Sequence, residues 1–319
     1  MWFKQLQLYR LSSTIDRCQL QQQLAKRAFI GATALEANAV GWVAPNRYQP
    51  QDYVYAAENS WLIAMHSEEK ILPSSVVKHF TDERVAEIEA SEARPVGRKE
   101  RREIQGEIAE QLLARAFSRY QTIHAIIDVE QGYLWLNQTS NSKTERFLKL
   151  LRESVSAIRI EPIKTRTSPI VAMTEYLAGG APWPYQLEDD CVLRANDNSE
   201  AEIRCKRHDL GTDEIRQHLK TGKQVVQLGL NWENKVAFVL NEQLQLKRLS
   251  FFDVVEEKLD SVDATDAAAL FDAQLMLMVT TLRLLIDDLL RALDVESMAA
   301  PSASGVKEPV LATDVEMVN

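Results

Sequence analysis

A long charged segment between two apolar strands constrains the fold more than any other feature. Residues 61–65 and 123–129 are short apolar runs of the kind that form buried strands. The segment between them favours helix, and Pro95 and Gly97 interrupt it near its middle. We therefore predict two helices with a bend between them, the second over 99–115. Because this pair has few apolar residues, it should project from a sheet as an arm and meet something other than its own core.

The rest of the chain alternates between further predicted strands and helices, which favours an α+β fold with antiparallel sheets and packed helices. The additional strands are expected at 1–11, 40–43, 133–137, 157–163, 192–195, 201–206, 225–230, 235–240 and 245–250, and the additional helices at 16–28, 142–154, 212–220 and 266–293. The predicted units are a central sheet domain (1–72 and 120–165), the arm (73–119), a base domain with the last helix (166–296) and a disordered tail (297–319).

The charge of the chain is unevenly distributed. The net charge is −9, and residues 253–296 alone hold eleven acids against three bases. The remainder is close to neutral, so the acidic total does not exclude a polyanionic partner, which responds to the local field. Three scattered cysteines, no basic-then-apolar leader and no apolar run as long as a membrane span predict a protein of the reducing cytoplasm.

The motifs of common enzyme classes are missing from the sequence. It has no phosphate-binding P-loop, no dinucleotide-binding glycine turn and no nucleophile elbow, so we expect no enzyme and no ATP-driven work. A nuclease needs only a few carboxylates, and Asp128 and Glu130 are the least unsuitable pair for a metal-dependent one. A structural turn is the favoured interpretation of this pair.

A metal site is also not expected. Cys205, His208 and His218 are ligand types, but no fourth ligand lies at a suitable spacing, so we predict no metal and no other cofactor. Cys191 and Cys205 are instead expected to face each other across a hairpin as small, buried residues.

Clustered cations are the strongest functional feature. Contacts with DNA phosphates need only cations held along a surface, whereas base recognition needs donors that enter a groove, and no recognition helix is evident. For the arm, the ordinary alternative is a solvated charged helix face, and for the whole protein it is a protein-interaction module without DNA binding. The candidate DNA-binding residues are Lys70, Lys78, Arg98, Lys99, Arg101, Arg102, Arg115, Arg119, Lys247 and Arg248, with a further basic group at Lys206, Arg207 and His208.

Two apolar features suggest contacts between subunits. Phe117 lies between Arg115 and Arg119 at the end of the arm, where an exposed aromatic ring could anchor an interface or could equally pack into the root of the arm. The last helix carries an apolar stripe from Leu275 to Leu289 that would serve either the core or a dimer seam.

Several short motifs resemble the recombination-associated RdgC proteins of bacteria, in the same order and at similar spacing from Met1 to about Leu293. They are the segments 2–4, 9–11, 41–43, 68–73, 115–119, 246–249 and 271–273. The resemblance implies a ring-shaped homodimer in the cytoplasm, associated with the nucleoid, that encircles double-stranded DNA without reading its sequence and restrains RecA. It also implies that Phe117 forms a dimer gate where the arm tips meet, opposite Lys206, Arg207 and His208.

Overall fold

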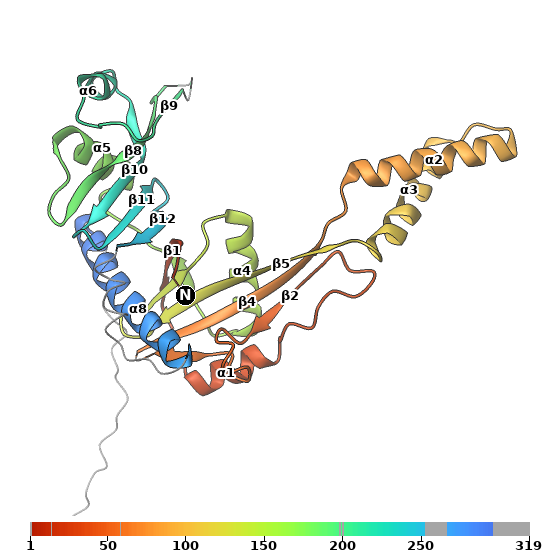
Figure 1. Ribbon diagram of the computed structural model, residues 1–319, viewed down its shortest axis with the longest axis horizontal. Helices are drawn as coiled ribbons and strands as arrows, with labels where there is room; N and C mark the ends of the chain where they lie inside the picture. The colour runs from red at the N-terminus through yellow and green to blue at the C-terminus, as the bar shows by residue number, and fades with distance from the viewer. Residues whose placement is uncertain are drawn as a thin grey trace, which may run out of the picture.

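The described part of the chain forms one continuous antiparallel sheet with helices on both faces and a projecting arm (Figure 1). The computed structural model describes residues 2–13, 15–57, 59–197, 199, 201–252 and 267–295. The predicted α+β class is confirmed. The predicted tail at 297–319 and much of the acidic segment, residues 253–266, lie outside the described residues.

Twelve strands make up the sheet, in the order β2-β4-β5-β6-β1-β12-β11-β10-β8-β9, with β3 on β4 and β7 on β1. The central half and the base half meet where β1 pairs with β12, with Gln5 opposite Lys247. The two predicted sheets are therefore continuous. The strands are β1 Gln5–Leu11, β2 Asn38–Val43, β3 Tyr55–Ala57, β4 Ser60–Lys70, β5 Ser118–Asp128, β6 Tyr133–Leu136, β7 Ile160–Pro162, β8 Tyr185–Arg194, β9 Glu202–Cys205, β10 Gln224–Trp232, β11 Val236–Asn241 and β12 Gln245–Phe251.

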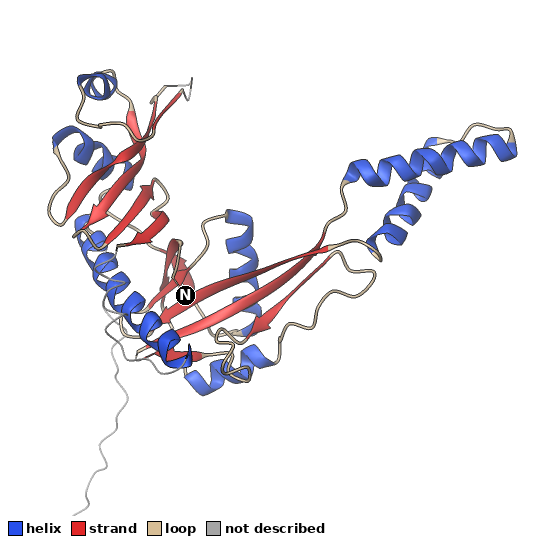
Figure 2. Cartoon of the chain, in the orientation of Figure 1, coloured by secondary structure: helices blue, strands red, loops and turns tan. Residues whose placement is uncertain are grey.

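Two cores hold the helices against the sheet. On one face of the central half, α1 (Arg17–Ala25) and α4 (Asn141–Ser154) enclose a core in which the rings of Trp42 and Phe147 meet edge to face, 5.4 Å between centroids. The other core takes in α5 (Pro169–Gly179) and α8 (Ala267–Ala292), on the outer side of the molecule (Figure 2). The remaining helix of the base half is α6 (Asp213–Lys220).

The last helix, α8, belongs to the core. It is long and apolar enough to cross a membrane by length and composition, but its stripe of Met278, Leu282, Leu285 and Ile286 is fully buried under the sheet. Its carboxylates also bind strand residues, since the indole nitrogen of Trp232 donates to Asp288 at 3.0 Å. Of the two alternatives for this stripe, a place in the core or a dimer seam, the place in the core is therefore confirmed.

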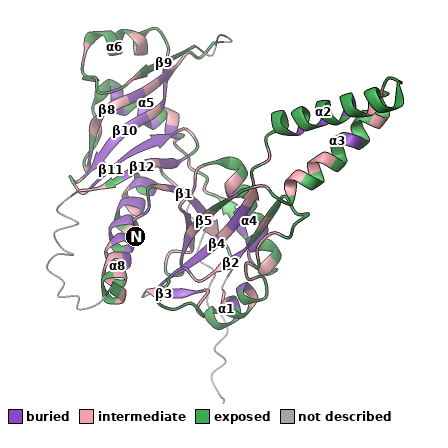
Figure 3. Cartoon of the chain, turned by 45° about the vertical axis from the view of Figure 1, so that its right-hand side comes forward, coloured by how far each residue is buried: buried purple, intermediate pink, exposed green. Residues whose placement is uncertain are grey.

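The arm consists of a β-ribbon and a helical hairpin. Strands β4 and β5 pair from Ser60 opposite Asp128 to Lys70 opposite Ser118, well beyond the short strands predicted. Beyond the ribbon lie α2 (Ser74–Glu92) and α3 (Arg98–Leu113), joined by the predicted bend. The helices contact each other through a thin apolar seam and are otherwise exposed (Figure 3).

Two elements were not predicted, β3 and α5. Helix α5 begins at Pro169 after Ser168, whose hydroxyl accepts a hydrogen bond from the amide of Val171, and it ends at the Gly179–Gly180 pair. Its first residues form an apolar run that periodicity alone cannot assign to helix or strand.

The base half of the sheet and the arm rise on either side of α4, so the molecule has an open concave side (Figure 1). Helices α5 and α8 lie on the outer side. The face of the base sheet opposite α5 is therefore turned toward the concave side.

Candidate functional site

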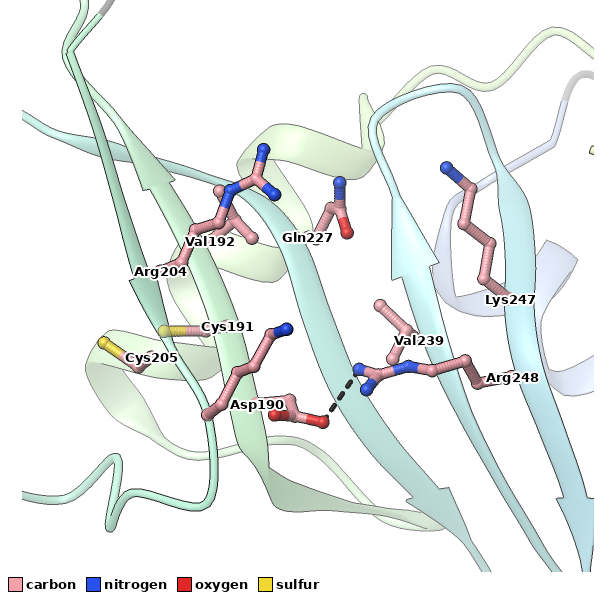
Figure 4. A pocket seen from close by; sticks show the side chains of 10 residues that line it. Asp190, Cys191, Val192, Arg204, Cys205, Gln227, Val239, Lys247 and Arg248 are labelled. Carbon is pink, nitrogen blue, oxygen red and sulfur yellow. Dashed lines mark ion pairs between the residues drawn. The ribbon is translucent and has the colours of Figure 1, made fainter. Parts of the chain in front are cut away.

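A cationic pocket lies on the base half of the sheet, on the face opposite α5 (Figure 4). We call it the sheet pocket. It measures about 290 Å³, and Val192 and Val239 form its apolar floor. These two residues alternate along their strands with side chains that pack in the α5–α8 core. The cations that line the pocket are Arg204, Lys206, Lys247 and Arg248.

The sheet pocket also contains one carboxylate, which holds one of its cations. A terminal guanidinium nitrogen of Arg248 lies 2.7 Å from Oδ2 of Asp190, with side chains 58% and 28% exposed. Ion pairs this accessible contribute at most about 1 kcal/mol, so Arg248 can exchange Asp190 for an external anion. Lys206 and Lys247 have no ion pair within 4 Å among the described residues, and their ammonium groups are available to a ligand.

Irregular strand pairing creates the sheet pocket. Ala237 pairs with Ser250 but Val239 pairs with Lys247, so β12 carries an extra residue, and Arg248 adopts a positive φ of 53° at this bulge. A bulge allows two successive side chains to reach the same face, as Lys247 and Arg248 do here. A second irregularity lies between β8 and β10 at Gly229, where an added Cβ would come within 3.0 Å of the Cβ of Glu188.

A second cationic pocket lies where the ribbon passes the N-terminal end of α4. We call it the ribbon pocket. It measures about 150 Å³ and is lined by Arg119, Lys143 and Arg146, together with Glu69. Arg119 lies 2.6 Å from Glu69 and, with weaker attraction from Arg146 and Lys143, holds the pKa of this carboxyl below its usual range. The pocket is therefore a cluster of cations around one ionised carboxylate.

Sequence reasoning identified Arg119 but missed Lys143 and Arg146. Both lie on the polar face of an amphipathic helix, where charged side chains are usually only exposed to solvent and have no binding role. Their spacing of three residues at the start of a helix was the available signal. Nothing in the sequence indicated that the ribbon is long enough to bring Arg119 beside them.

The arm cations are dispersed and partly neutralised. Arg101 pairs with Asp82 across the helical hairpin, and Lys99, 94% exposed, lies 3.9 Å from Glu103. Three other predicted arm cations have no ion pair within 4 Å among the residues described: Lys78, Arg98 and Arg102. The two pockets do not include any of these five residues, so their contact with DNA stays a prediction.

The predicted cations at the root of the arm divide between two roles. The ammonium group of Lys70 donates to the carbonyl oxygens of Thr33 and Ala34, at 2.7 and 2.8 Å, and so ties a loop to the ribbon. Arg115 is exposed just after α3. Arg119 lines the ribbon pocket.

The predicted gate residues lie on two separate elements. Phe117 is 86% exposed, and its carbonyl accepts a hydrogen bond from the amide of Ile71 at 2.7 Å. The tip of the arm is the α2–α3 turn, so the expectation that Phe117 lies at the arm tips is wrong, because α3 runs back to the ribbon before this residue. Lys206 lines the sheet pocket, and Arg207 and His208 follow it. Contact between these groups across two copies stays a prediction.

Asp128 and Glu130 form a structural ion-pair cluster. Asp128 is fully buried, and Arg283 of α8 binds both of its oxygens, at 2.9 and 3.2 Å. The amides of Glu130 and Gln131 also donate to Asp128, and Glu130 lies 3.1 Å from Arg283. Because both carboxylates are engaged by the same guanidinium, this pair is a poor site for a catalytic metal.

The other metal candidates do not converge either. Over the described ranges, no three His, Cys, Asp or Glu side chains gather in a way that could hold an ion. Cys191 and Cys205 do lie opposite each other on β8 and β9, as predicted.

Comparison with known proteins gives a consistent result over nearly the whole chain. A family model described as "Putative exonuclease, RdgC" matches residues 1–296. A protein of Laribacter hongkongensis (strain HLHK9) is 40% identical over 301 residues, which cover 94% of this chain and 100% of that protein. A relative from Janthinobacterium sp. (strain Marseille) is 36% identical, and the match covers 92% of this chain and 98% of that protein. A relative from Dechloromonas aromatica (strain RCB) is 35% identical, and the match covers 94% of this chain and 100% of that protein. All three are named "Recombination-associated protein RdgC", a name that states no catalytic activity.

Proposed function

Because this chain belongs to the RdgC family of recombination-associated proteins, we propose that it binds double-stranded DNA through phosphate contacts without reading sequence. The proposal includes closure of two copies into a ring around the duplex and negative modulation of RecA-dependent recombination. Its setting would be the cytoplasm, in association with the nucleoid.

The observation that carries the proposal is the pair of cationic pockets. Seven cations line the sheet pocket and the ribbon pocket, and the strands, helix and ribbon that hold them are fixed by the sheet. Phosphate oxygens are strong acceptors for arginine and lysine, and such contacts position a protein on DNA without carrying sequence information.

The carboxylate in each pocket supports reversible contact with the backbone. Asp190 and Glu69 each hold one arginine that a phosphate could take over. A phosphate that replaces a partly exposed carboxylate gains a charge-assisted hydrogen bond and loses little pairing energy. Pockets of this kind suit a protein that releases and rebinds along a duplex.

Ring closure is supported by the shape of a single copy and by an exposed apolar pair. The concave side is open, so one copy alone cannot surround a duplex. Phe117 is 86% exposed and Ile71 is 51% exposed, and they lie side by side at the base of the arm. An exposed aromatic ring next to an aliphatic side chain is a suitable anchor for a protein interface.

The test is binding to a random-sequence DNA duplex, measured across salt concentrations with an unrelated duplex as competitor. We consider a plot of the logarithm of the binding constant against the logarithm of the salt concentration. If each of the seven pocket cations neutralised one phosphate, the slope of this plot would be at most about −6 per chain. A steep slope with equal competition supports the proposal. Absence of binding at low salt contradicts it and favours a protein-interaction module.

The same samples test the nuclease alternative. The Asp128–Arg283 cluster predicts that the duplex stays intact during incubation with Mg²⁺ or Mn²⁺. Cleavage that disappears in a Glu130→Gln variant, at a side chain that is 53% exposed, would contradict this assignment.

A further inference from the structure

Two cysteines lie directly opposite each other at one edge of the sheet. Cys191 on β8 is paired in register with Cys205 on β9, the edge strand. Their side chains lie next to each other on the two strands (Figure 4). The third cysteine, Cys18, is exposed on α1, which packs against the central half of the sheet.

The backbone spacing at this position fits a disulfide. The amide of Ala195 donates to the carbonyl of Ala201 at 2.9 Å, and Cys191 and Cys205 lie four pairs further along the same ladder. Alternate pairs of an antiparallel ladder are equivalent, so this is a hydrogen-bonded pair, in which opposite Cα atoms are about 5.5 Å apart. Disulfides span Cα separations of about 4.4–6.8 Å. The strands therefore need no rearrangement to bring the sulfur atoms to bonding distance.

We propose that Cys191 and Cys205 are a thiol-oxidation site that forms a reversible disulfide across β8 and β9. The inference goes beyond the proposed function and does not depend on DNA binding. A bond across an edge strand is accessible to small reductants, and disulfides that are exposed or strained are the readily reversed ones.

The two sulfur atoms differ in accessibility, which sets the order of the steps. Cys191 is 2% exposed, and burial followed by the proximity of Cys205 raises the pKa of its thiol to about 12. Cys205 is partly exposed on the edge strand, so a small oxidant meets it first. Cys191 then acts as the resolving thiol.

With oxidised glutathione as the oxidant, the Cys205 sulfur attacks one sulfur of the glutathione disulfide. A mixed disulfide forms, and one reduced glutathione leaves. The Cys191 sulfur then attacks the Cys205 sulfur, gives up its proton and releases the second reduced glutathione. The protein loses two electrons and two protons, and the glutathione disulfide gains both.

The disulfide would act on the part of the sheet pocket that β9 carries. Among the strands that the structure describes, β9 pairs only with β8. It holds Arg204, and Lys206 follows directly after its end. A covalent link across Cys191 and Cys205 holds this short edge strand in register. We expect the amides of β9 to exchange hydrogen more slowly in the oxidised protein.

The experiment uses the full chain with Cys18→Ser, which removes disulfides between copies through the exposed cysteine. The protein is equilibrated with oxidised glutathione, free thiols are blocked, and the digest is examined by mass spectrometry without reduction. The expected product is a Cys191–Cys205 linked peptide, with loss of both free thiols and recovery of both after dithiothreitol. Protection of the β9 amides is measured on the same samples.

Cys205→Ser is the matched control, because this partly exposed position tolerates an isosteric hydroxyl, and it should yield no linked peptide. Persistence of a mixed disulfide at Cys205 while Cys191 is still blocked by the alkylating reagent would overturn the proposal. DNA affinity does not enter either readout, so failure of this inference and failure of the proposed function are distinguishable.

Discussion

Replacing Arg283 with methionine tests the buried ion pair that joins α8 to the central sheet. The guanidinium binds both oxygens of Asp128, which has no exposed surface, and it also donates to the hydroxyl of Ser60 at 3.1 Å. Methionine keeps most of the apolar volume but leaves the carboxylate without its cation. Loss of one partner of a buried pair costs about 3–5 kcal/mol.

The structure places the expected effect at the lower end of this range. Two backbone amides, those of Glu130 and Gln131, still donate to Asp128 at 3.1 and 3.2 Å in the variant. We expect the free energy of unfolding to fall by about 3 kcal/mol. The measurement is equilibrium unfolding in urea, followed by circular dichroism. Asp128→Asn combined with Arg283→Met should recover part of the loss, because the unpaired charge is then absent.

Arg291→Met is the matched control on the same helix. Arg291 is 78% exposed and lies 3.3 Å from Asp288, so its loss should cost less than about 1 kcal/mol. If Arg283→Met and Arg291→Met lose the same small amount, the buried pair does not stabilise the fold in the way described.

Three further predictions concern the interface, backbone packing and pH. Phe117→Glu should weaken self-association in sedimentation experiments while changing the free energy of unfolding by less than about 0.5 kcal/mol, and unchanged association would exclude this surface as the interface. Gly41→Ala should cost about 1–3 kcal/mol, because an added Cβ would lie 2.4 Å from the Cα of Phe29, whereas Gly106→Ala, in open space, should not destabilise. Burial lowers the pKa of His124 to about 4 from 6.5, so the unfolded state binds the proton first, and stability should fall as pH drops from about 6.5 to about 4; His124→Gln should flatten this fall, and an unchanged pH profile would contradict the assignment.

The arm shows what the sequence could and could not predict. Helix-forming residues interrupted by Pro95 and Gly97 identified both helices and the bend. The ribbon beneath them was underestimated, because polar residues such as Glu69 and Gln121 end the apolar pattern while the strands continue. Pairing between β4 and β5 stabilises these polar stretches as strand, and a single sequence does not reveal that pairing.

The two pockets depend even more on tertiary structure. Lys247 and Arg248 were identified as adjacent cations, but only the bulge turns both toward one face. Lys143 and Arg146 come from a helix far from Arg119 in sequence, and they join it through the long ribbon. The sequence therefore identified the residue types, whereas it did not predict the strand register or the contacts between elements that are distant in sequence.

The most direct test of the account is the salt dependence of duplex binding in two matched double variants. Lys206→Gln with Lys247→Gln removes two cations of the sheet pocket that have no ion pair among the described residues. Arg17→Gln with Lys26→Gln removes two exposed cations at the two ends of α1, away from both pockets. The account predicts that the first variant binds more weakly at every salt concentration and that its salt slope is shallower by about two, while the second keeps the slope of the unmodified protein. Equal slopes for the sheet-pocket variant and the unmodified protein would contradict the central claim that this pocket contacts the DNA backbone.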